Sequence, residues 1–140
     1  MIALDTNLLL YDFHARAPEH RAAQAMMAQL RGRHWGVALA VLTEFYSVTT
    51  QSGLAAAMAT TAEAAAYVEW LLAQGGQIWE PLPGFGERVV ASAHEHGIIG
   101  RRIFDWQIGL TALDHGAIEL WTHDRAFLAP PGLRLVDPLA

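Results

Sequence analysis

The segment that decides the fold is Met1-Ile-Ala-Leu-Asp5-Thr6-Asn7, a short apolar run that ends directly at an acid. A second run of the same kind lies near the other end, where Thr122-His-Asp124 follows Ile118-Glu-Leu-Trp121. Short, mostly apolar runs are typical of strands buried inside a sheet. A carboxylate at the end of such a strand lies beside the core, where an isolated charge is costly unless it has a partner. The acids at the ends of both runs are therefore candidates for a functional site.

Short strands alternate with longer helices along the chain. We expect strands at residues 1–4, 35–38, 77–80, 117–121 and 133–136. We expect helices at residues 7–13, 18–31, 40–50, 61–73, 85–95 and 104–114, a further short helix at 54–60 and a helical turn at 124–128. This alternation predicts the α/β class, with residues 1–140 forming a single domain. The expected architecture is a three-layer α/β/α domain around a central, mostly parallel sheet of four to five strands.

Several local signals refine these helices. Thr60 or Thr61 is a suitable N-cap for the helix that runs to Ala73, and Gly75-Gly76 is a stop signal. The helix at 18–31 carries an apolar stripe at helical spacing, for which we expect inward positions at Ala22, Ala25, Met26, Gln29 and Leu30. Trp35, Trp79 and Trp121 fall on expected strands and are predicted core residues, whereas Trp70 and Trp106 are candidates for contact with a partner.

Composition narrows the class of protein. The chain has 140 residues, of which 53% are hydrophobic, and a formal net charge of −5, which argues against broad, non-specific nucleic-acid binding. It has no Cys, and all nine basic residues are Arg, so thiolate metal sites and catalytic lysines are excluded. No apolar stretch approaches the ~20 residues that a membrane-spanning helix needs. The start lacks the basic segment of a signal peptide, so we expect a cytoplasmic protein without a membrane anchor.

Four acids are expected to converge. Ligands of open α/β sheets bind beyond the carboxyl ends of the strands, where Asp5 and Asp124 both fall. Helical spacing places Glu44 on the same face as Val41 and Val48, and that face is apolar. Asp105 leads an apolar face in the same way, in the first turn of its helix. We therefore expect Glu44 and Asp105 to point inward.

Each acid alone also has an ordinary structural interpretation. Asp5 and Asp124 could cap the helical segments that follow them, and Asp105 could be a favourable acid at a helix N-terminus. Glu44, in mid-helix, has no capping role. Together the four predict a site for divalent cations, and oxygen ligands select Mg²⁺ or Mn²⁺ over zinc. Such ions bind phosphate oxygens and activate water for attack on phosphorus.

Basic and imidazole groups flank these acids. Arg101, Arg102 and Arg125 are candidate RNA-backbone contacts, because guanidinium groups suit phosphate, although ordinary exposed arginines explain the pair 101–102 equally well. His123 is the histidine nearest to the expected site, and we interpret it as an exposed residue. Asp114 lies nine residues after Asp105, on the opposite helix face, and we expect it to be solvated.

These segments resemble the PIN domain, specifically the VapC-type toxin ribonucleases of toxin–antitoxin pairs. The resemblance rests on four segments, which are Ile2-Ala-Leu-Asp5-Thr6-Asn7, Leu42-Thr-Glu44-Phe45, Phe104-Asp105, and Trp121-Thr122-His-Asp124-Arg-Ala-Phe127. It implies a Mg²⁺- or Mn²⁺-dependent endoribonuclease that forms homodimers and is neutralised by a cognate antitoxin. It also implies that Asp5, Glu44, Asp105 and Asp124 are the catalytic, metal-centred acids and that Asn7 and Thr122 are accessory polar groups.

The chain departs from the family pattern at two positions. Ala126 stands where many members carry a further acid, and Trp106 follows Asp105 where a smaller side chain is usual. Neither departure removes one of the four acids.

Two alternatives remain open. Asp5-Thr-Asn7 is also similar to the start of haloacid-dehalogenase-type phosphatases, but Asn7 stands in the place of their second acid and the expected Lys is absent. A non-catalytic PIN-like binding module should have lost at least one acid, and all four are retained.

Overall fold

A parallel sheet forms the centre of the molecule, for which a computed structural model describes residues 1–53 and 56–140. The strands are β1 (Ile2–Leu4), β2 (Trp35–Ala38), β3 (Gln77–Trp79), β4 (Glu119–Trp121) and β5 (Arg134–Val136). They pair in parallel in the order β3-β2-β1-β4-β5. The predicted α/β fold is therefore confirmed, and β1 is its central strand.

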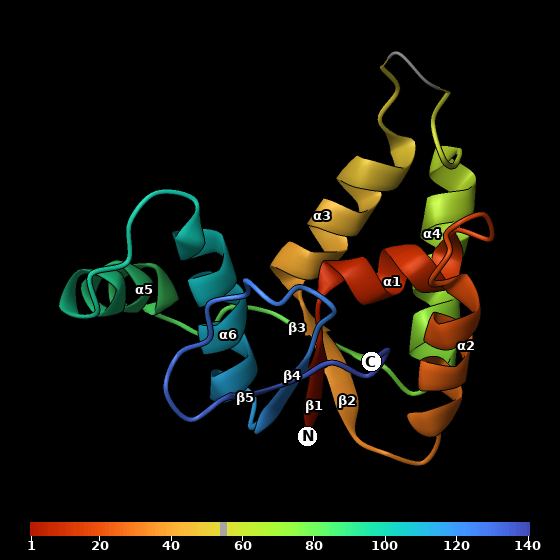
Figure 1. Ribbon diagram of the computed structural model, residues 1–140. Helices are drawn as coiled ribbons and strands as arrows, with labels where there is room; N and C mark the ends of the chain where they lie inside the picture. Colours follow the sequence, from red (N-terminus) through yellow and green to blue (C-terminus); the bar gives the residue numbers. More distant parts are fainter. Residues whose placement is uncertain (54–55) are drawn as a thin grey trace.

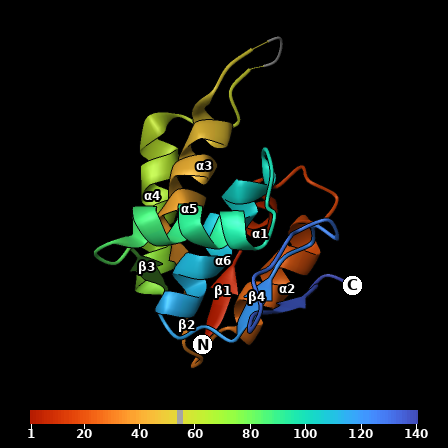
Figure 2. The same ribbon diagram turned by 90° about the vertical axis from the view of Figure 1, so that its left-hand side faces the viewer.

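Six helices in the described part of the chain cover both faces of this sheet. They are α1 (Thr6–Phe13), α2 (His20–Gln29), α3 (Leu39–Thr50), α4 (Thr61–Ala73), α5 (Phe85–Glu95) and α6 (Arg102–Asp114). α5 and α6 lie on one side of the strands, and α1, α2 and α4 lie on the other (Figure 1). Figure 2 looks onto the sheet from the α5–α6 side, with these two helices in front of the strands. The expected three layers are thus present.

The apolar runs form the core because they lie in the middle of these layers. Every residue of β1 and β2 is buried. Leu4, Trp35, Phe45 and Leu120 are among the largest fully buried side chains, and they come from three strands and one helix. Trp35, Trp79 and Trp121 all lie in the core, as predicted. The hydrophobic effect therefore fixes β1, and with it the position of Asp5 at its end.

Local signals are confirmed where they have a specific hydrogen-bonding role. Thr60 and Glu63 form a reciprocal capping box at the start of α4. Gly75, which follows the C-cap residue Gln74, has a positive φ of 91°, a conformation that favours glycine. These two signals explain why the expected bounds of α4 agree with the observed ones.

The expected buried face and bounds of the helix at residues 18–31 are wrong. The buried face of α2 consists of Ala23, Met26 and Met27, followed by Leu30, so Ala22, Ala25 and Gln29 are exposed instead of inward. The helix is also shorter than expected, because residues 18–19 and 30–31 lie in turns at its two ends. An Ala-rich helix fits several phases of the apolar stripe, and the larger Met side chains decide which one is buried.

Three further corrections concern other segments. Residues 56–60 are not helical, and residues 54–55 of that expected helix lie outside the described part of the chain. The segment 124–128 is a turn and not a helix. Trp106 is buried and donates a hydrogen bond from Nε1 to Ser92 Oγ at 3.0 Å, so it is not available to a partner, whereas Trp70 is exposed. None of the helices that the structure describes is long and apolar enough to cross a membrane.

Candidate active site

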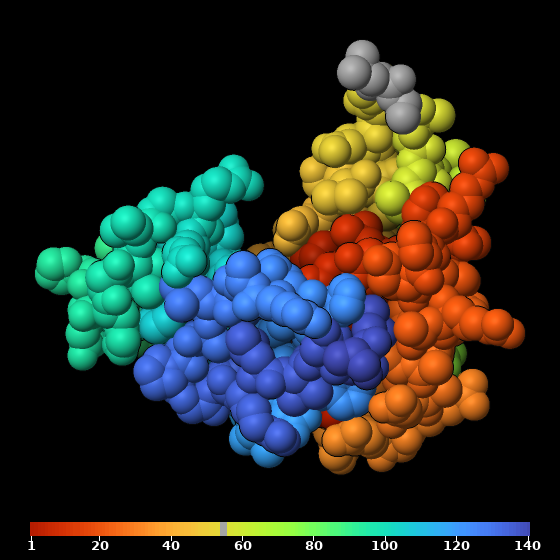
Figure 3. Space-filling model, in the orientation of Figure 1, coloured from red at the N-terminus to blue at the C-terminus, as the bar shows by residue number. Residues whose placement is uncertain are grey.

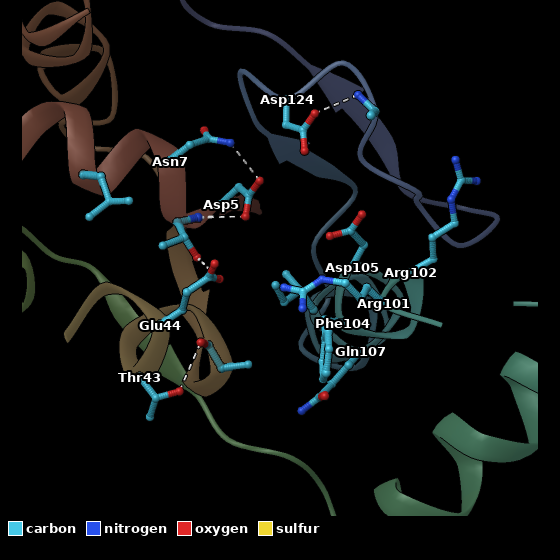
Figure 4. A pocket seen from close by; sticks show the side chains of 15 residues that line it. Asp5, Asn7, Thr43, Glu44, Arg101, Arg102, Phe104, Asp105, Gln107 and Asp124 are labelled. Atoms are coloured by element: carbon cyan, nitrogen blue, oxygen red, sulfur yellow. Dashed lines mark hydrogen bonds between the residues drawn. The ribbon is translucent and has the colours of Figure 1, made fainter. Parts of the chain in front are cut away.

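A cavity of about 750 Å³ opens at the carboxyl ends of the central strands. It separates α3 from α6, and the surface is hollowed between these helices (Figure 3). The predicted acids Asp5, Glu44, Asp105 and Asp124 all line it. Figure 4 shows the four carboxylates on elements that surround one space. The remaining lining residues are Thr6, Asn7, Leu10, Ala40, Thr43, Arg101, Arg102, Phe104, Gln107, Ile108 and Ala126.

Asp5 is the buried acid of the cavity, with 7% of its surface exposed. Its Oδ1 accepts a hydrogen bond from the Thr6 backbone N–H at 2.8 Å. Its Oδ2 accepts from Thr122 Oγ1 at 2.7 Å and from Asn7 Nδ2 at 3.1 Å. Burial raises the pKa of Asp5 from 3.8 to about 6; the hydrogen bonds from Thr122 and Thr6 oppose this shift, and the charges of Glu44 and Asp105 add to it. Its carboxylate is thus held in one orientation in a place that disfavours its charge.

Asn7 and Thr122 connect the ends of β1 and β4. Asn7 Nδ2 donates to Thr122 Oγ1 at 3.1 Å, and Asn7 Oδ1 accepts from the His123 backbone N–H at 3.2 Å. Thr122 Oγ1 also accepts from the Asp124 backbone N–H at 3.0 Å. The structure therefore places both predicted accessory residues between Asp5 and the loop that carries Asp124.

Glu44 does not occupy the buried position expected for it. Its residue is exposed in mid-α3, while Val41, Leu42 and Phe45 face the core. Its Oε2 accepts a hydrogen bond from Thr6 Oγ1 at 2.8 Å, which turns the carboxylate toward the cavity. A mid-helix carboxylate is thus tied to the residue after Asp5, a link that helical spacing could not reveal.

Asp105 and Asp124 form the other side of the cavity. Asp105 is half-buried, and its Oδ2 accepts from the Leu128 backbone N–H at 3.2 Å. Burial raises the pKa of Asp105, and the hydrogen bond from Leu128 opposes this shift. The negative charges of Asp124 and Glu44 raise the pKa further, whereas the positive charge of Arg102 lowers it. Asp124 is exposed and accepts from the Ala126 backbone N–H at 2.8 Å, in an Asx-type turn.

Gly109 explains how α6 comes close enough to the loop after β4. A Cβ at this position would clash with the Pro130 ring, so the helix and the loop touch through the glycine backbone. This close approach places the start of α6 beside Leu128. Asp105 reaches the cavity as a result.

The predicted arginines divide into two groups. Arg101 and Arg102 line the cavity, whereas Arg125 is exposed outside it. Asp114 also differs from expectation, since it is half-buried and pairs with both terminal nitrogens of Arg88. That pairing joins α5 to α6 across 26 positions of sequence.

The residues of the cavity suit a divalent cation that keeps several water ligands better than one whose ligands all come from the protein. Across residues 1–53 and 56–140, no three His, Asp or Glu side chains are close enough together to hold one metal ion. The donors around the cavity are nevertheless carboxylate, hydroxyl and amide oxygens, which suit Mg²⁺ or Mn²⁺. Mg²⁺ typically keeps several waters and binds through one or two carboxylates, and this cavity offers such a site.

Two features of the site are not predicted by the residue patterns. His123 Nδ1 is within 2.9 Å of Asp137 Oδ2, and its ring packs edge-on to Tyr11, so His123 is half-buried and paired instead of exposed. Phe104 lines the cavity although 57% of its surface is exposed. No local signal marks Asp137 as the partner of His123. Phe104 could have been found from its position beside Asp105.

Comparison with known proteins gives consistent matches. Residues 2–133 match the PIN domain family. Ribonuclease VapC24 of Mycobacterium tuberculosis is 31% identical, with 89% of this chain and 86% of that protein covered. Ribonuclease VapC33 of the same organism is 29% identical, with 99% of each chain covered.

Two solved structures share the fold. The structure of VapBC2 from Rickettsia felis, bound to a DNA fragment from its promoter, covers 97% of this chain and 98% of the matched chain, with a TM-score of 0.68 and 19% identity. Mycobacterium tuberculosis VapC20, described as a sarcin-ricin-loop-cleaving toxin, covers 91% of this chain and 92% of that chain, with a TM-score of 0.71 and 15% identity. At these identities the likeness concerns the fold alone.

Proposed function

This chain belongs to the PIN-domain family, and we propose that it is a divalent-metal-dependent endoribonuclease that hydrolyses RNA phosphodiester bonds. The observation that supports this proposal best is the convergence of Asp5, Glu44, Asp105 and Asp124 on one cavity. The relatives named as VapC ribonucleases support the choice of RNA as the substrate. The haloacid-dehalogenase alternative has no comparable support.

The biological role that we propose is that of the toxin in a type II toxin–antitoxin pair, acting in the cytoplasm. A similar fold occurs in a VapBC2 structure, so we infer that a cognate antitoxin protein binds this chain. We also propose that the chain forms a homodimer, as its resemblance to VapC toxins implies.

In the proposed mechanism, Asp5, Glu44, Asp105 and Asp124 surround the cavity, where one or two of them would bind Mg²⁺ or Mn²⁺ directly and the others would bind its water ligands. The cation, when bound, makes water a stronger nucleophile at neutral pH and stabilises the charge that develops on the phosphate. Thr122 and Asn7 keep the Asp5 carboxylate in a single orientation through their hydrogen bonds to Oδ2. Thr6 holds Oε2 of Glu44, and the second oxygen of this carboxylate would accept a proton from the attacking water. The water oxygen forms the new P–O bond, the P–O bond to the leaving ribose oxygen breaks, and the leaving oxygen takes up a proton from solvent. Arg101 and Arg102 supply positive charge to the RNA backbone.

Four single substitutions test the proposal: Asp5→Asn, Glu44→Gln, Asp105→Asn and Asp124→Asn. Each should slow the cleavage of a labelled RNA by about 100-fold or more. Loss of a group that only supports a metal ligand typically lowers metal affinity or activity by about 10- to 100-fold, and these four acids face the cavity themselves. Asp114→Asn is the matched control, since this acid faces Arg88 and does not line the cavity. Circular dichroism should show that all five variants are folded. Unchanged cleavage by the Asp5→Asn variant would refute the assignment.

Metal binding has a readout that does not depend on activity. Mn²⁺ at about 100 times its dissociation constant should stabilise the unsubstituted protein by about 2.7 kcal/mol, seen as a rise in Tm. The Asp105→Asn variant should show a smaller rise at the same concentration, and the Asp114→Asn control should match the unsubstituted protein. A phosphatase would instead hydrolyse a chromogenic phosphomonoester, which this protein should leave intact.

A further inference from the structure

Phe104 is an exposed aromatic residue inside a charged cavity. It lies in the first turn of α6, directly before Asp105, and 57% of its surface is accessible to solvent. Arg101 lies three positions before it and Gln107 three positions after it, so helical spacing places these side chains on one face. All three line the cavity. Figure 4 shows Phe104 and Gln107 on the α6 side, across the cavity from Glu44 and Thr43 of α3.

Exposure of an apolar side chain is ordinary by itself, and the location distinguishes Phe104. Val90 and Ile99 are more exposed, at 62% and 77%, and neither lines the cavity. Phe104 instead stands next to two arginines, an amide and an acid of the site. Proteins that bind single-stranded nucleic acids combine these elements, with an aromatic face for a base and cationic groups for the backbone.

We propose that Phe104 is the stacking platform for an unpaired base of the RNA next to the phosphate that is cut. This inference rests on the proposed ribonuclease function and adds a specificity-determining residue to it. The base lies on the Phe104 ring, Gln107 hydrogen-bonds its edge, and Arg101 and Arg102 bind the adjacent phosphates. A base inside a duplex is already stacked on its neighbours, so the platform selects RNA that is single-stranded at the cleavage point.

The test compares Phe104 variants on two RNA probes. One probe is a fluorescein-labelled oligoadenylate of about 12 nucleotides, and the other is an abasic ribose-phosphate strand of the same length. All proteins carry Asp5→Asn, so that cleavage of the probes is slow while fluorescence anisotropy gives the Kd. Phe104→Ala should weaken oligoadenylate binding by about 5- to 150-fold, the usual range for one lost base–aromatic stack. Phe104→Trp should bind at least as tightly as Phe104, and the abasic strand should bind all variants equally.

Ile99→Ala provides the matched control, because it removes a more exposed apolar side chain outside the cavity. It should change neither Kd nor, without Asp5→Asn, the rate of RNA cleavage. If Phe104→Ala behaves like this control on oligoadenylate while the unsubstituted protein cuts RNA, the platform is refuted and the ribonuclease stands. Equal losses on both probes would also refute stacking.

Two further outcomes separate the inference from its premise. If the unsubstituted protein neither binds nor cuts RNA with Mg²⁺ or Mn²⁺ present, the proposed function fails and the platform fails with it. If Phe104→Ala leaves oligoadenylate binding intact but abolishes binding of a partner protein, the exposed ring serves a protein contact and the platform is refuted.

Discussion

The two walls of the cavity are built differently. On the β1–α1 side, Asp5 is buried and accepts hydrogen bonds from Thr6, Asn7 and Thr122. On the α6 side, Asp105 is half-buried with a hydrogen bond from one backbone N–H, and Asp124 is exposed. One wall is therefore fixed by a side-chain network, and the other is more open to solvent.

This difference suggests a division of labour. Side chains that packing and hydrogen bonds hold in one orientation can position a reacting group. No reorganisation of these side chains is then needed during the reaction. Exposed side chains such as Phe104 and Arg102 can adjust to a large, flexible substrate. For the proposed ribonuclease, we infer that the β1–α1 wall positions the reacting groups and that the α6 wall contacts the RNA.

The largest expected effect on stability tests the burial of Asp5. Unfolded chains lose the Asp5 proton near pH 3.8, whereas the folded protein keeps it to about pH 6. The unfolding free energy should consequently fall as the pH rises through this window, by at most about 3 kcal/mol at about 1.4 kcal/mol per pKa unit. Urea unfolding in EDTA between pH 4 and 8 gives the unfolding free energies of the unsubstituted protein and of the Asp5→Asn variant. The difference between these two free energies at each pH is the contribution of Asp5.

The same measurement on Asp105→Asn sharpens the comparison. The pKa of Asp105 is also raised, chiefly by burial, so its difference should have the same sign. A difference that stays flat with pH for Asp5→Asn would show that the β1–α1 wall does not strain its carboxylate.

The network around Asp5 should matter next most. Thr122→Val keeps the shape of this buried side chain but removes the hydroxyl that joins Asp5, Asn7 and Asp124. RNA cleavage should fall by about 10- to 100-fold, as for groups that orient a metal ligand. Thr122→Ser keeps the hydroxyl and should retain most activity. Equal activity of the Val and Ser variants would contradict a positioning role for the network.

The smallest expected effect is that of a substitution in α4, which belongs to neither wall of the cavity. Thr60→Ala removes the N-cap of α4 and should cost about 1 kcal/mol in a denaturant unfolding experiment. RNA cleavage at a temperature well below Tm should be unchanged, since α4 does not line the cavity. A parallel loss of cleavage would show that the cavity depends on distant helices and is not fixed locally.

Residue patterns predict the structure correctly where short-range interactions decide it. Trp35–Ala38 is a fully buried strand with the bounds expected from its apolar run. Thr60 caps α4 because its hydroxyl accepts from the Glu63 backbone N–H within the same turn. Asp5 and Asp124 follow parallel strands, so the topology of the sheet was enough to bring them to one edge.

Residue patterns do not predict contacts between side chains that lie far apart in the sequence, nor which face of a helix is buried when several faces are similarly apolar. Spacing placed Glu44 on the apolar face, but α3 buries Phe45 and Thr49, which leaves Glu44 exposed beside Thr6. Asp114 was expected in solvent, and only the packing of α5 on α6 brings Arg88 to it. These contacts depend on tertiary packing, which residue spacing within one helix does not report.

The bond between Thr122 and Asp5 joins residues 117 positions apart, since β4 pairs directly with β1. Such a distant pairing has to close a long loop, which carries an entropic cost. Because β4 lies at Glu119–Trp121, a ribosome has synthesised most of this polypeptide before β4 can dock on β1. Nascent chains that end before Thr122 lack both that bond and Asp124, which makes truncated products of translation incapable of assembling the cavity.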